Sequence, residues 1–225
     1  IIDLSQDFRN DNFFIKTKRK FIYGLPEINK PLIRKAYNIA NPGCFATAII
    51  LGLLPSVKNN IIDDDIYSNA ITGSTGAGII PSDSTHYSWR NNNISWYKPF
   101  EHQHLEEINN TLFKKSKRKN NINLLTYRGP FTRGIYCNSY FRSNKSINEI
   151  IDLYEAFYKE TAFVKISKSE IDIKNVVNSN KCLIHVKKIN DKILITSVID
   201  NLIKGPCAQA IQNMNLMFGI DEKSG

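Results

Sequence analysis

The sequence has few cysteines and no long apolar run. Its four cysteines, Cys44, Cys137, Cys182 and Cys207, form no C-x-x-C pair and are too sparse for a disulfide framework in 225 residues. No stretch of about 18 apolar residues is present, as a membrane span would need, and the start at Ile1 shows neither a basic segment nor a small-residue cleavage site. We therefore expect reduced thiols, no membrane partner and a cytoplasmic protein.

Acidic residues are fewer than basic ones, with 21 Asp and Glu against 30 Lys and Arg, so the formal net charge is +9. Clustered Lys and Arg attract phosphate backbones, so an RNA-binding protein with salt-sensitive RNA retention is one alternative. The lysines are dispersed, however, and the densest run, 114–119, is typical of a solvated loop after a helix. We expect no nucleic-acid partner and assign the surplus charge to an anionic substrate.

The sequence predicts alternating strands and helices. Residues 45–54 are nearly all apolar between Pro42-Gly43 and Pro55, which predicts a buried helix of about three turns with Cys44 at its N-terminus. The Ser146 to Glu149 capping box predicts a helix over 147–159. Further helices are expected over 31–37, from His104 and over 207–218, and strands over 1–4, 66–72, 122–127, 134–141, 182–188 and 192–199.

Cys44 is the first candidate for chemistry. A thiol attacks as the thiolate, and a helix N-terminus lowers its pKa because the free N–H groups and the helix dipole favour the anion. The same N–H groups can hold the oxyanion of a tetrahedral intermediate. The alternative is a buried cysteine that packs as a small hydrophobe, and this is our interpretation of Cys137, Cys182 and Cys207.

His102 and His104 are the second candidates, because a catalytic cysteine needs an acid or base. At a helix start the two rings diverge, so we expect only one of them to face Cys44 and favour His104, kept neutral by the helix dipole. A zinc site built from His86, these two histidines and Cys44 is a weak alternative, because H-x-H lacks a nearby carboxylate or C-x-x-C.

The irregular stretch from residue 73 to 101 is the third candidate, since long irregular segments in compact domains tend to be functional. Gly76, Ala77 and Gly78 would let a cofactor or acyl group approach the backbone, although turns use the same residues. Arg90 and Arg133 can each donate a pair of hydrogen bonds to a phosphate or carboxylate, or they can form ordinary surface ion pairs.

Together these residues resemble the N-acetyl-γ-glutamyl-phosphate reductase family, whose catalytic domain is similar to that of glyceraldehyde-3-phosphate dehydrogenase. The resemblance covers the whole chain in seven ordered motifs. They are Ile2-Asp3-Leu4-Ser5 with Asp7-Phe8-Arg9, Tyr23-Gly24-Leu25-Pro26-Glu27, Asn41-Pro42-Gly43-Cys44, Gly76-Ala77-Gly78, His102-Gln103-His104 with Glu107-Ile108, Arg133-Gly134-Ile135, and Asp200-Asn201-Leu202 with Lys204-Gly205 and Gln212-Asn213-Met214-Asn215.

The resemblance implies an α/β fold in which a mixed, largely antiparallel sheet is covered by helices. Residues 1–43 would be the remnant of a Rossmann-like NADP-binding domain whose Gly-rich turn precedes Ile1. Residues 44–204 would be the catalytic and dimerisation domain, and residues 205–225 a C-terminal helix that packs back toward the cofactor domain. The chain departs from the family at Pro206-Cys207-Ala208, where small residues with a glycine are usual.

The resemblance also implies roles for residues. Cys44 would be the nucleophile, and His104 with His102 the acid and base. Gly76, Ala77, Gly78 and Asn201 would lie at the nicotinamide of NADPH, and Asn41, Arg90, Tyr97 and Arg133 would bind the acyl-phosphate substrate. No metal is implied, and a homodimer or homotetramer through the sheet is expected.

The predicted activity is NADPH-dependent reduction of an N-acyl-glutamyl 5-phosphate to the semialdehyde through a Cys44 thioester, in arginine biosynthesis. A sister acyl-phosphate reductase of the aspartate-semialdehyde dehydrogenase or lysine-pathway type is one alternative. Another is a non-catalytic fragment that serves as a dimerisation module or complementing subunit.

Overall fold

The largest feature of the fold is a mixed sheet. In the computed structural model, which describes residues 1–10, 19–114 and 119–225, seven strands are ordered β5-β6-β4-β7-β10-β9-β8. Four of the six pairings between these strands are antiparallel, and β4–β6 and β8–β9 are parallel. The predicted fold, with a largely antiparallel mixed sheet, is confirmed. Most of the basic run 114–119 lies outside the described residues.

The five long strands lie where the sequence predicted them, and all but the last, whose side chains are mostly buried, alternate more and less buried side chains with a period of two. They are β4 (Ile66–Thr72), β6 (Ile122–Arg128), β7 (Ile135–Arg142), β9 (Cys182–Ile189) and β10 (Lys192–Ile199). The two edge strands, β5 (Ser95–Tyr97) and β8 (Val164–Ser167), were not predicted. They are too short to show a period, and form by pairing with β6 and β9.

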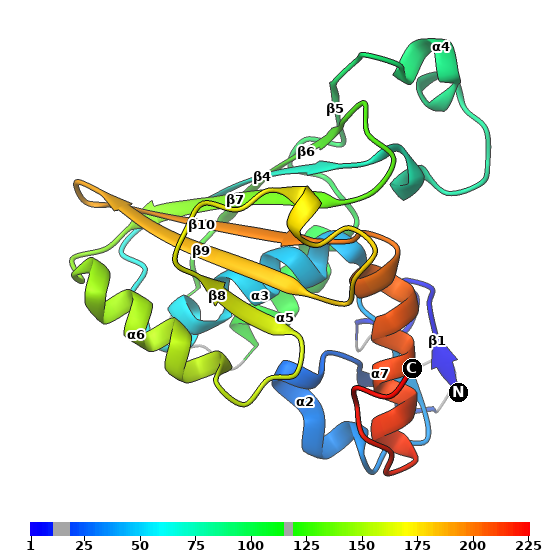
Figure 1. The fold of residues 1–225 in the computed structure, drawn as a ribbon, viewed down its shortest axis with the longest axis horizontal. Coiled ribbons are helices and arrows are strands. Elements are labelled where there is room, and N and C mark those ends of the chain that lie inside the picture. The colour runs from blue at the N-terminus through cyan, green and yellow to red at the C-terminus, as the bar shows by residue number, and fades with distance from the viewer. Residues whose placement is uncertain (11–18, 115–118) are drawn as a thin grey trace.

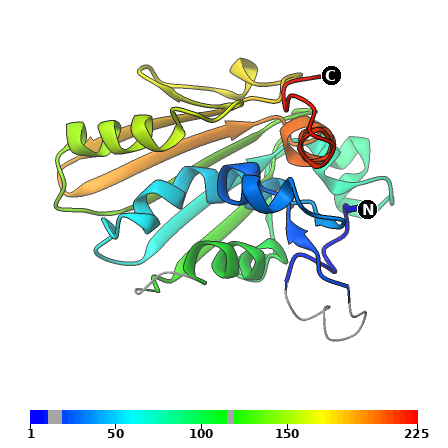
Figure 2. The same cartoon turned by 90° about the horizontal axis from the view of Figure 1, so that it is seen from below.

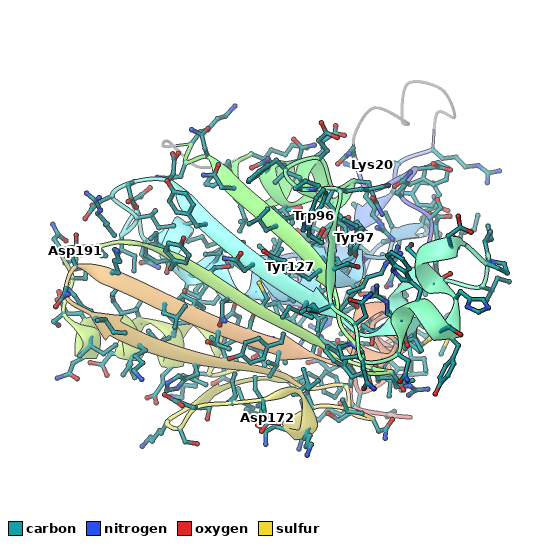
Figure 3. The ribbon with its side chains drawn as sticks, turned by 90° about the horizontal axis from the view of Figure 1, so that it is seen from above. Lys20, Trp96, Tyr97, Tyr127, Asp172 and Asp191 are labelled. Carbon is teal, nitrogen blue, oxygen red and sulfur yellow. The ribbon has the colours of Figure 1, made fainter. Side chains whose placement is uncertain are left out.

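Helices cover only one face of this sheet. Helices α3 (Cys44–Lys58), α5 (His104–Phe113) and α6 (Ile147–Tyr158) lie side by side beneath it (Figures 1 and 2). The other face carries no α-helix among the described residues (Figure 3), but Ile171 and Val176, on either side of the 3-10 turn η4 (Ile173–Asn175), pack on Val198 at one end of it. The segment with α4 (Tyr87–Arg90) and the 3-10 turn η3 (Asp83–Thr85) projects from the end of the sheet where β5 lies (Figure 1).

Helix α3 forms the centre of the core, and every residue from Phe45 to Val57 is buried. The sequence predicted that this helix ends before Pro55, which is wrong, because it continues to Lys58. A proline cannot donate to the carbonyl four residues earlier, here that of Leu51. The hydroxyl of Tyr158 on α6 donates to this carbonyl at 2.5 Å instead. The freed acceptor is therefore satisfied, and the helix can pass through the proline.

The remaining helices follow local sequence signals. The capping box of α6 is confirmed, since Glu149 N–H donates to Ser146 Oγ at 3.2 Å and Ser146 N–H donates to Glu149 Oε2 at 2.8 Å. Helix α2 (Pro26–Ile33) begins five residues before the predicted position, because Pro26 occupies its first turn, where the missing N–H costs nothing.

A small parallel sheet stands beside the large one. Its strands are β1 (Ile2–Asp3), β3 (Ile39–Ala40) and β2 (Ile22–Tyr23), with β3 in the middle. Helix α7 (Ala208–Met217) lies beside this sheet (Figure 2), and Ile33, Ile39 and Leu216 form a separate buried cluster. Strand β3 leads directly into Asn41 and Cys44. The small sheet therefore positions the start of α3.

We predict that Tyr158→Phe lowers the free energy of unfolding by about 1–3 kcal/mol, because the buried Leu51 O, which receives no N–H from Pro55, loses its hydroxyl donor. Urea titration followed by circular dichroism measures this change. The matched control is Tyr87→Phe, at an exposed tyrosine, which should change the stability by less than about 0.5 kcal/mol. Equal effects of the two substitutions would contradict the compensation of Pro55 by Tyr158.

Candidate active site

A cavity of about 350 Å³ opens at the amino end of α3. Segments far apart in the sequence meet there, including the loop before α3, the loop after β4, the start of α5 and the turn after β10. The cavity is lined by Arg9, residues 42–45, Thr72, residues 75–78, Tyr97, Lys98, residues 102–104, Arg128, Asn201, Leu202 and Pro206.

Cys44 is the first residue of α3 and is partly exposed in this cavity. Gly43 is the N-cap in an extended conformation and provides no side-chain cap for the first N–H groups of the helix. The N–H groups of Phe45 and Cys44 lower the pKa of the thiol, as the sequence predicted. Burial has the larger effect, however, and raises the pKa of Cys44 to about 11. The prediction of a depressed pKa is wrong, and the resting group is the thiol.

His104 is the first residue of α5, as predicted, and packs against the loop before Cys44. A Cβ atom on Gly43 would lie 2.4 Å from His104 Nε2, so only glycine allows this approach. The Nε2 atom lies 3.4 Å from Arg9 Nη1, while Nδ1 is buried without a partner among the described residues. Burial holds the pKa of His104 well below its usual value, with smaller contributions from His102 and Arg9. The imidazole is therefore neutral.

His102 lies in contact with His104, with the ring centroids 4.7 Å apart and the rings nearly perpendicular. Its Nδ1 accepts the backbone N–H of His104 at 3.1 Å, which folds the ring back onto the start of α5. Both histidines line the cavity. That only one of the two rings faces Cys44 stays a prediction. Burial lowers the pKa of His102 to about 4, so this ring is neutral as well.

Glu107 links the segments that carry Cys44 and His104, although it was not predicted from the sequence as a site residue. Its Oε1 accepts Gly43 N–H at 2.9 Å and the hydroxyl of Tyr23 at 2.7 Å, and its Oε2 accepts Arg9 Nη1 at 3.2 Å. Burial raises the pKa of Glu107, and these donors counteract the rise. The motif His102-x-His104-x-x-Glu107 was the available signal, because it brings Glu107 one helical turn after His104.

The glycine-containing loop forms the wall of the cavity opposite α5. The 3-10 turn η2 (Ser74–Ala77) is held by Asn201, whose Nδ2 donates to Thr75 Oγ1 at 3.0 Å. Asn201 Oδ1 accepts Gly134 N–H at 2.7 Å. Gly78 has a φ of +78° and no atom within 4 Å of the place a Cβ would occupy. The predicted residues Gly76, Ala77, Gly78 and Asn201 therefore lie together in the cavity.

The cavity is cationic. Its described lining includes Arg9, Lys98 and Arg128 but neither Asp nor Glu. The Arg128 guanidinium lies 4.4 Å from the centroid of the Tyr97 ring, and burial raises the pKa of Tyr97. Tyr97 lies at the β5 edge of the sheet beside Trp96 and Tyr127 (Figure 3). Arg128 was missed in the sequence, because nothing in the run Arg128-Gly129-Pro130 distinguishes it from a turn.

Comparisons with known proteins agree with this architecture. The family model described as semialdehyde dehydrogenase, dimerisation domain, matches residues 44–201. The N-acetyl-gamma-glutamyl-phosphate reductase of Azobacteroides pseudotrichonymphae is 51% identical over 225 residues, which are 100% of this chain and 69% of that protein. This chain belongs to the N-acetyl-gamma-glutamyl-phosphate reductase family. The family member of Parabacteroides distasonis is also 51% identical, over 226 residues and with the same coverage.

The chain thus comes from a family of oxidoreductases, and solved structures of another reductase show its fold. Aspartate semialdehyde dehydrogenase II from Vibrio cholerae superposes with a TM-score of 0.72 at 18% identity, over 97% of this chain and 72% of that chain. The aspartate semialdehyde dehydrogenase of Francisella tularensis gives a TM-score of 0.71 at 14% identity, over 96% of this chain and 74% of that chain.

Three residues predicted to bind substrate in this reductase family member are not brought to the cavity. Arg90 Nη1 donates to the backbone carbonyl of Arg128 at 2.6 Å and its Nη2 to Ser95 Oγ at 2.8 Å, so the guanidinium is used within the projecting segment. Arg133 Nη1 donates to Asn178 Oδ1 at 3.1 Å. Asn41 is buried, and its Nδ2 donates to the carbonyl of Pro206 at 3.1 Å.

The residues of the alternative zinc site do not come together in this structure. His86 is exposed, and its Nδ1 accepts Ser88 N–H on α4, outside the cavity. In the described part of the chain, no three His, Cys, Asp or Glu side chains gather in a way that would hold a metal ion. Over the same residues, no helix is long and apolar enough to cross a bilayer.

We predict that alkylation of Cys44 by iodoacetamide accelerates about tenfold for each pH unit between 7 and 9, because the thiolate fraction grows in that proportion below a pKa of about 11. Peptide-resolved mass spectrometry measures the rate at Cys44 separately from the rate at the exposed Cys207. A rate at Cys44 that is already constant between pH 8 and 9 would mean that the resting group is the thiolate.

Proposed function

We propose that this protein catalyses the NADPH-dependent reduction of an N-acyl-glutamyl 5-phosphate to the N-acyl-glutamate 5-semialdehyde, with release of phosphate, in arginine biosynthesis. The observation that carries the proposal is a partly exposed cysteine at a helix N-terminus in one cationic cavity with two neutral histidines. Identity of about half the residues to named N-acetyl-gamma-glutamyl-phosphate reductases supports this choice over a sister acyl-phosphate reductase.

The lining of the cavity suits the proposed substrate. An acyl phosphate and the carboxylate of glutamate are both anionic, and Lys98 and Arg128 offer cationic donors without a competing carboxylate in the described lining. Tyr97, predicted from the sequence to bind substrate, lies between Arg128 and the histidines, with its ring centroid 5.6 Å from that of His102. We assign substrate binding to these three residues.

The residues predicted to hold NADPH fit a nicotinamide. Gly78 offers open space where a Cβ would otherwise be, and Gly76, Ala77 and Asn201 line the same wall of the cavity. These residues would hold the ring beside Cys44. When bound there, NADPH supplies the hydride that takes the acyl group to the aldehyde level.

Cys44 begins the reaction as a thiol. Its proton passes to His104 as the sulfur attacks the carbonyl carbon of the acyl phosphate, and a neutral imidazole is the form that can accept it. The carbonyl oxygen becomes an oxyanion that the N–H groups at the start of α3 can hold. The C–O bond to phosphate then breaks, which leaves the acyl group on the sulfur as a thioester.

The same groups act in reverse when the product leaves. The N–H groups at the start of α3 hold the oxyanion again, and the bond from carbon to sulfur breaks as the aldehyde carbonyl forms. His104 returns a proton to Cys44, which restores the resting thiol. His102 fixes the start of α5 through its bond to His104 N–H, and so orients the ring that carries the proton.

We predict that Cys44→Ser lowers kcat by at least about 1000-fold, because a serine hydroxyl at its free pKa is a much weaker nucleophile than a cysteine thiol. Reductase activity is followed by NADPH absorbance with N-acetylglutamyl phosphate as substrate. The variant should unfold within about 2 °C of the parent, since the two side chains are similar in size. Activity within tenfold of the parent would refute Cys44 as the nucleophile.

We further propose that the protein forms a homodimer or homotetramer through the uncovered face of the sheet. This surface, the open face, carries the outward residues of five strands. They are Tyr67, Asn69 and Ile71 on β4, Asn123, Leu125 and Tyr127 on β6, Tyr136, Asn138 and Tyr140 on β7, Leu194 and Thr196 on β10, and Leu183, His185 and Lys187 on β9. Val198, the next outward residue of β10, is covered by Ile171 and Val176. The matching family model is that of a dimerisation domain.

We predict that Tyr140→Asp reduces the molar mass in solution to that of one chain. Tyr140 stacks on Tyr67 with the ring centroids 5.2 Å apart, and a carboxylate placed among these aromatic rings is costly to desolvate in an interface. Size-exclusion chromatography with light scattering measures the mass. Tyr37→Asp, at an exposed tyrosine away from the sheet, is the control and should leave the mass unchanged. An unchanged mass for Tyr140→Asp would place the interface elsewhere.

A further inference from the structure

One buried charge takes no part in the chemistry proposed above. The side chain of Lys204 is 0% exposed, and its Nζ donates to Glu27 Oε1 and to Gln212 Oε1, both at 3.1 Å. The side chain of Glu27 is only 2% exposed. A buried ion pair of this kind costs desolvation free energy on both sides, and an apolar pair of the same volume would often be as stable. Stability alone is therefore a weak explanation for its presence.

Lys204 lies in the turn that touches the nucleophile. The turn, η5 (Ile203–Cys207), is a π-helix in which Gly205 N–H donates to Asp200 O and Cys207 N–H donates to Leu202 O, both at 3.0 Å. A Cβ on Gly205 would lie 3.0 Å from the Cys44 Cβ, and Pro206 lines the cavity. Within one turn, residue 204 is anchored in the interior while residues 205 and 206 form the wall beside the thiol.

The π-helical turn depends on contacts with other elements for its stability. A π-helix is rare and is found mostly as a single turn at functional sites, which indicates that its own hydrogen bonds stabilise it poorly. Pro206 removes one further N–H donor from this turn. The ammonium group of Lys204 ties the turn to α2 through Glu27 and to α7 through Gln212. These two helices belong to the part of the molecule that surrounds the small sheet.

We propose that Lys204 is a positioning residue, which through its bonds to Glu27 and Gln212 holds the π-turn Ile203–Cys207 against Cys44 and so sets the position and solvent exposure of the nucleophilic thiol. The proposal rests on Cys44 being the nucleophile. Without the bonds from Lys204 to Glu27 and Gln212, the turn moves away from Cys44 and the thiol becomes more exposed to water. The sulfur then loses its fixed direction of attack.

The test uses the double substitution Lys204→Met with Glu27→Gln, since Lys204→Met alone leaves a buried carboxylate unpaired and can prevent folding. We expect the folded double variant to keep KM within about twofold and to lose roughly 10- to 100-fold in kcat, because small misplacements of a reacting group have effects of this size. We also expect the pH profile of Cys44 alkylation to move to lower pH, because burial is what raises the pKa of this thiol.

The matched control is Lys30→Met. This substitution removes a partly exposed ion pair, with a distance of 2.6 Å, between α2 and Glu222 of the C-terminal region, but it keeps the bond from Gln212 Nε2 to Glu222 Oε2 and does not touch the π-turn. Lys204→Arg should restore part of kcat, because it keeps the charge. A folded double variant whose kcat and Cys44 alkylation profile both equal those of the control overturns the proposal. Alkylation does not depend on reductase activity, so its outcome is separate from that of the proposed function.

Discussion

The arrangement of the site depends on one buried carboxylate. Glu107 accepts hydrogen bonds from the backbone before Cys44, from Tyr23 of the small sheet and from Arg9 of the N-terminal segment. It lies on the same helix as His104 and one turn further on. Glu107 therefore fixes the start of α3 against α5, in a region where burial makes every unpaired polar atom costly.

The same burial explains the resting state of the nucleophile. The N–H groups at the start of α3 and the nearby Arg9 favour the thiolate, but desolvation outweighs them, and it also keeps both histidines neutral. In the resting state, the Cys44 thiol and the His104 imidazole are therefore both uncharged. An uncharged thiol is less reactive toward adventitious alkylation and oxidation than a thiolate, because the thiolate is the nucleophilic form.

Local patterns in the sequence predicted local structure well. The long strands, the cap of α6 and the position of Cys44 and His104 at the first residues of their helices all follow from short-range periodicity and turn residues. Residues 76–78, Asn201 and Tyr97 converge on the cavity as the family resemblance implied. The features that could not be predicted depend on contacts between residues that are distant in the sequence. The roles of Glu107, Arg128 and Lys204, the edge strands, and the internal bonds of Arg90 arise from elements that lie far apart in the chain.

The proline within α3 restricts the order in which Pro55 and Tyr158 can be substituted as the sequence diverges. Leu51 O accepts from Tyr158 because Pro55 has no proton to give it. A chain that first exchanges the proline for alanine gives up part of a buried ring but gains a backbone donor for that oxygen, so the bond from the phenol is no longer needed to satisfy it. A chain that first loses the hydroxyl passes through a state with a carbonyl stranded in hydrocarbon. Divergence at these two positions therefore has one accessible route, in which the proline is replaced before the tyrosine.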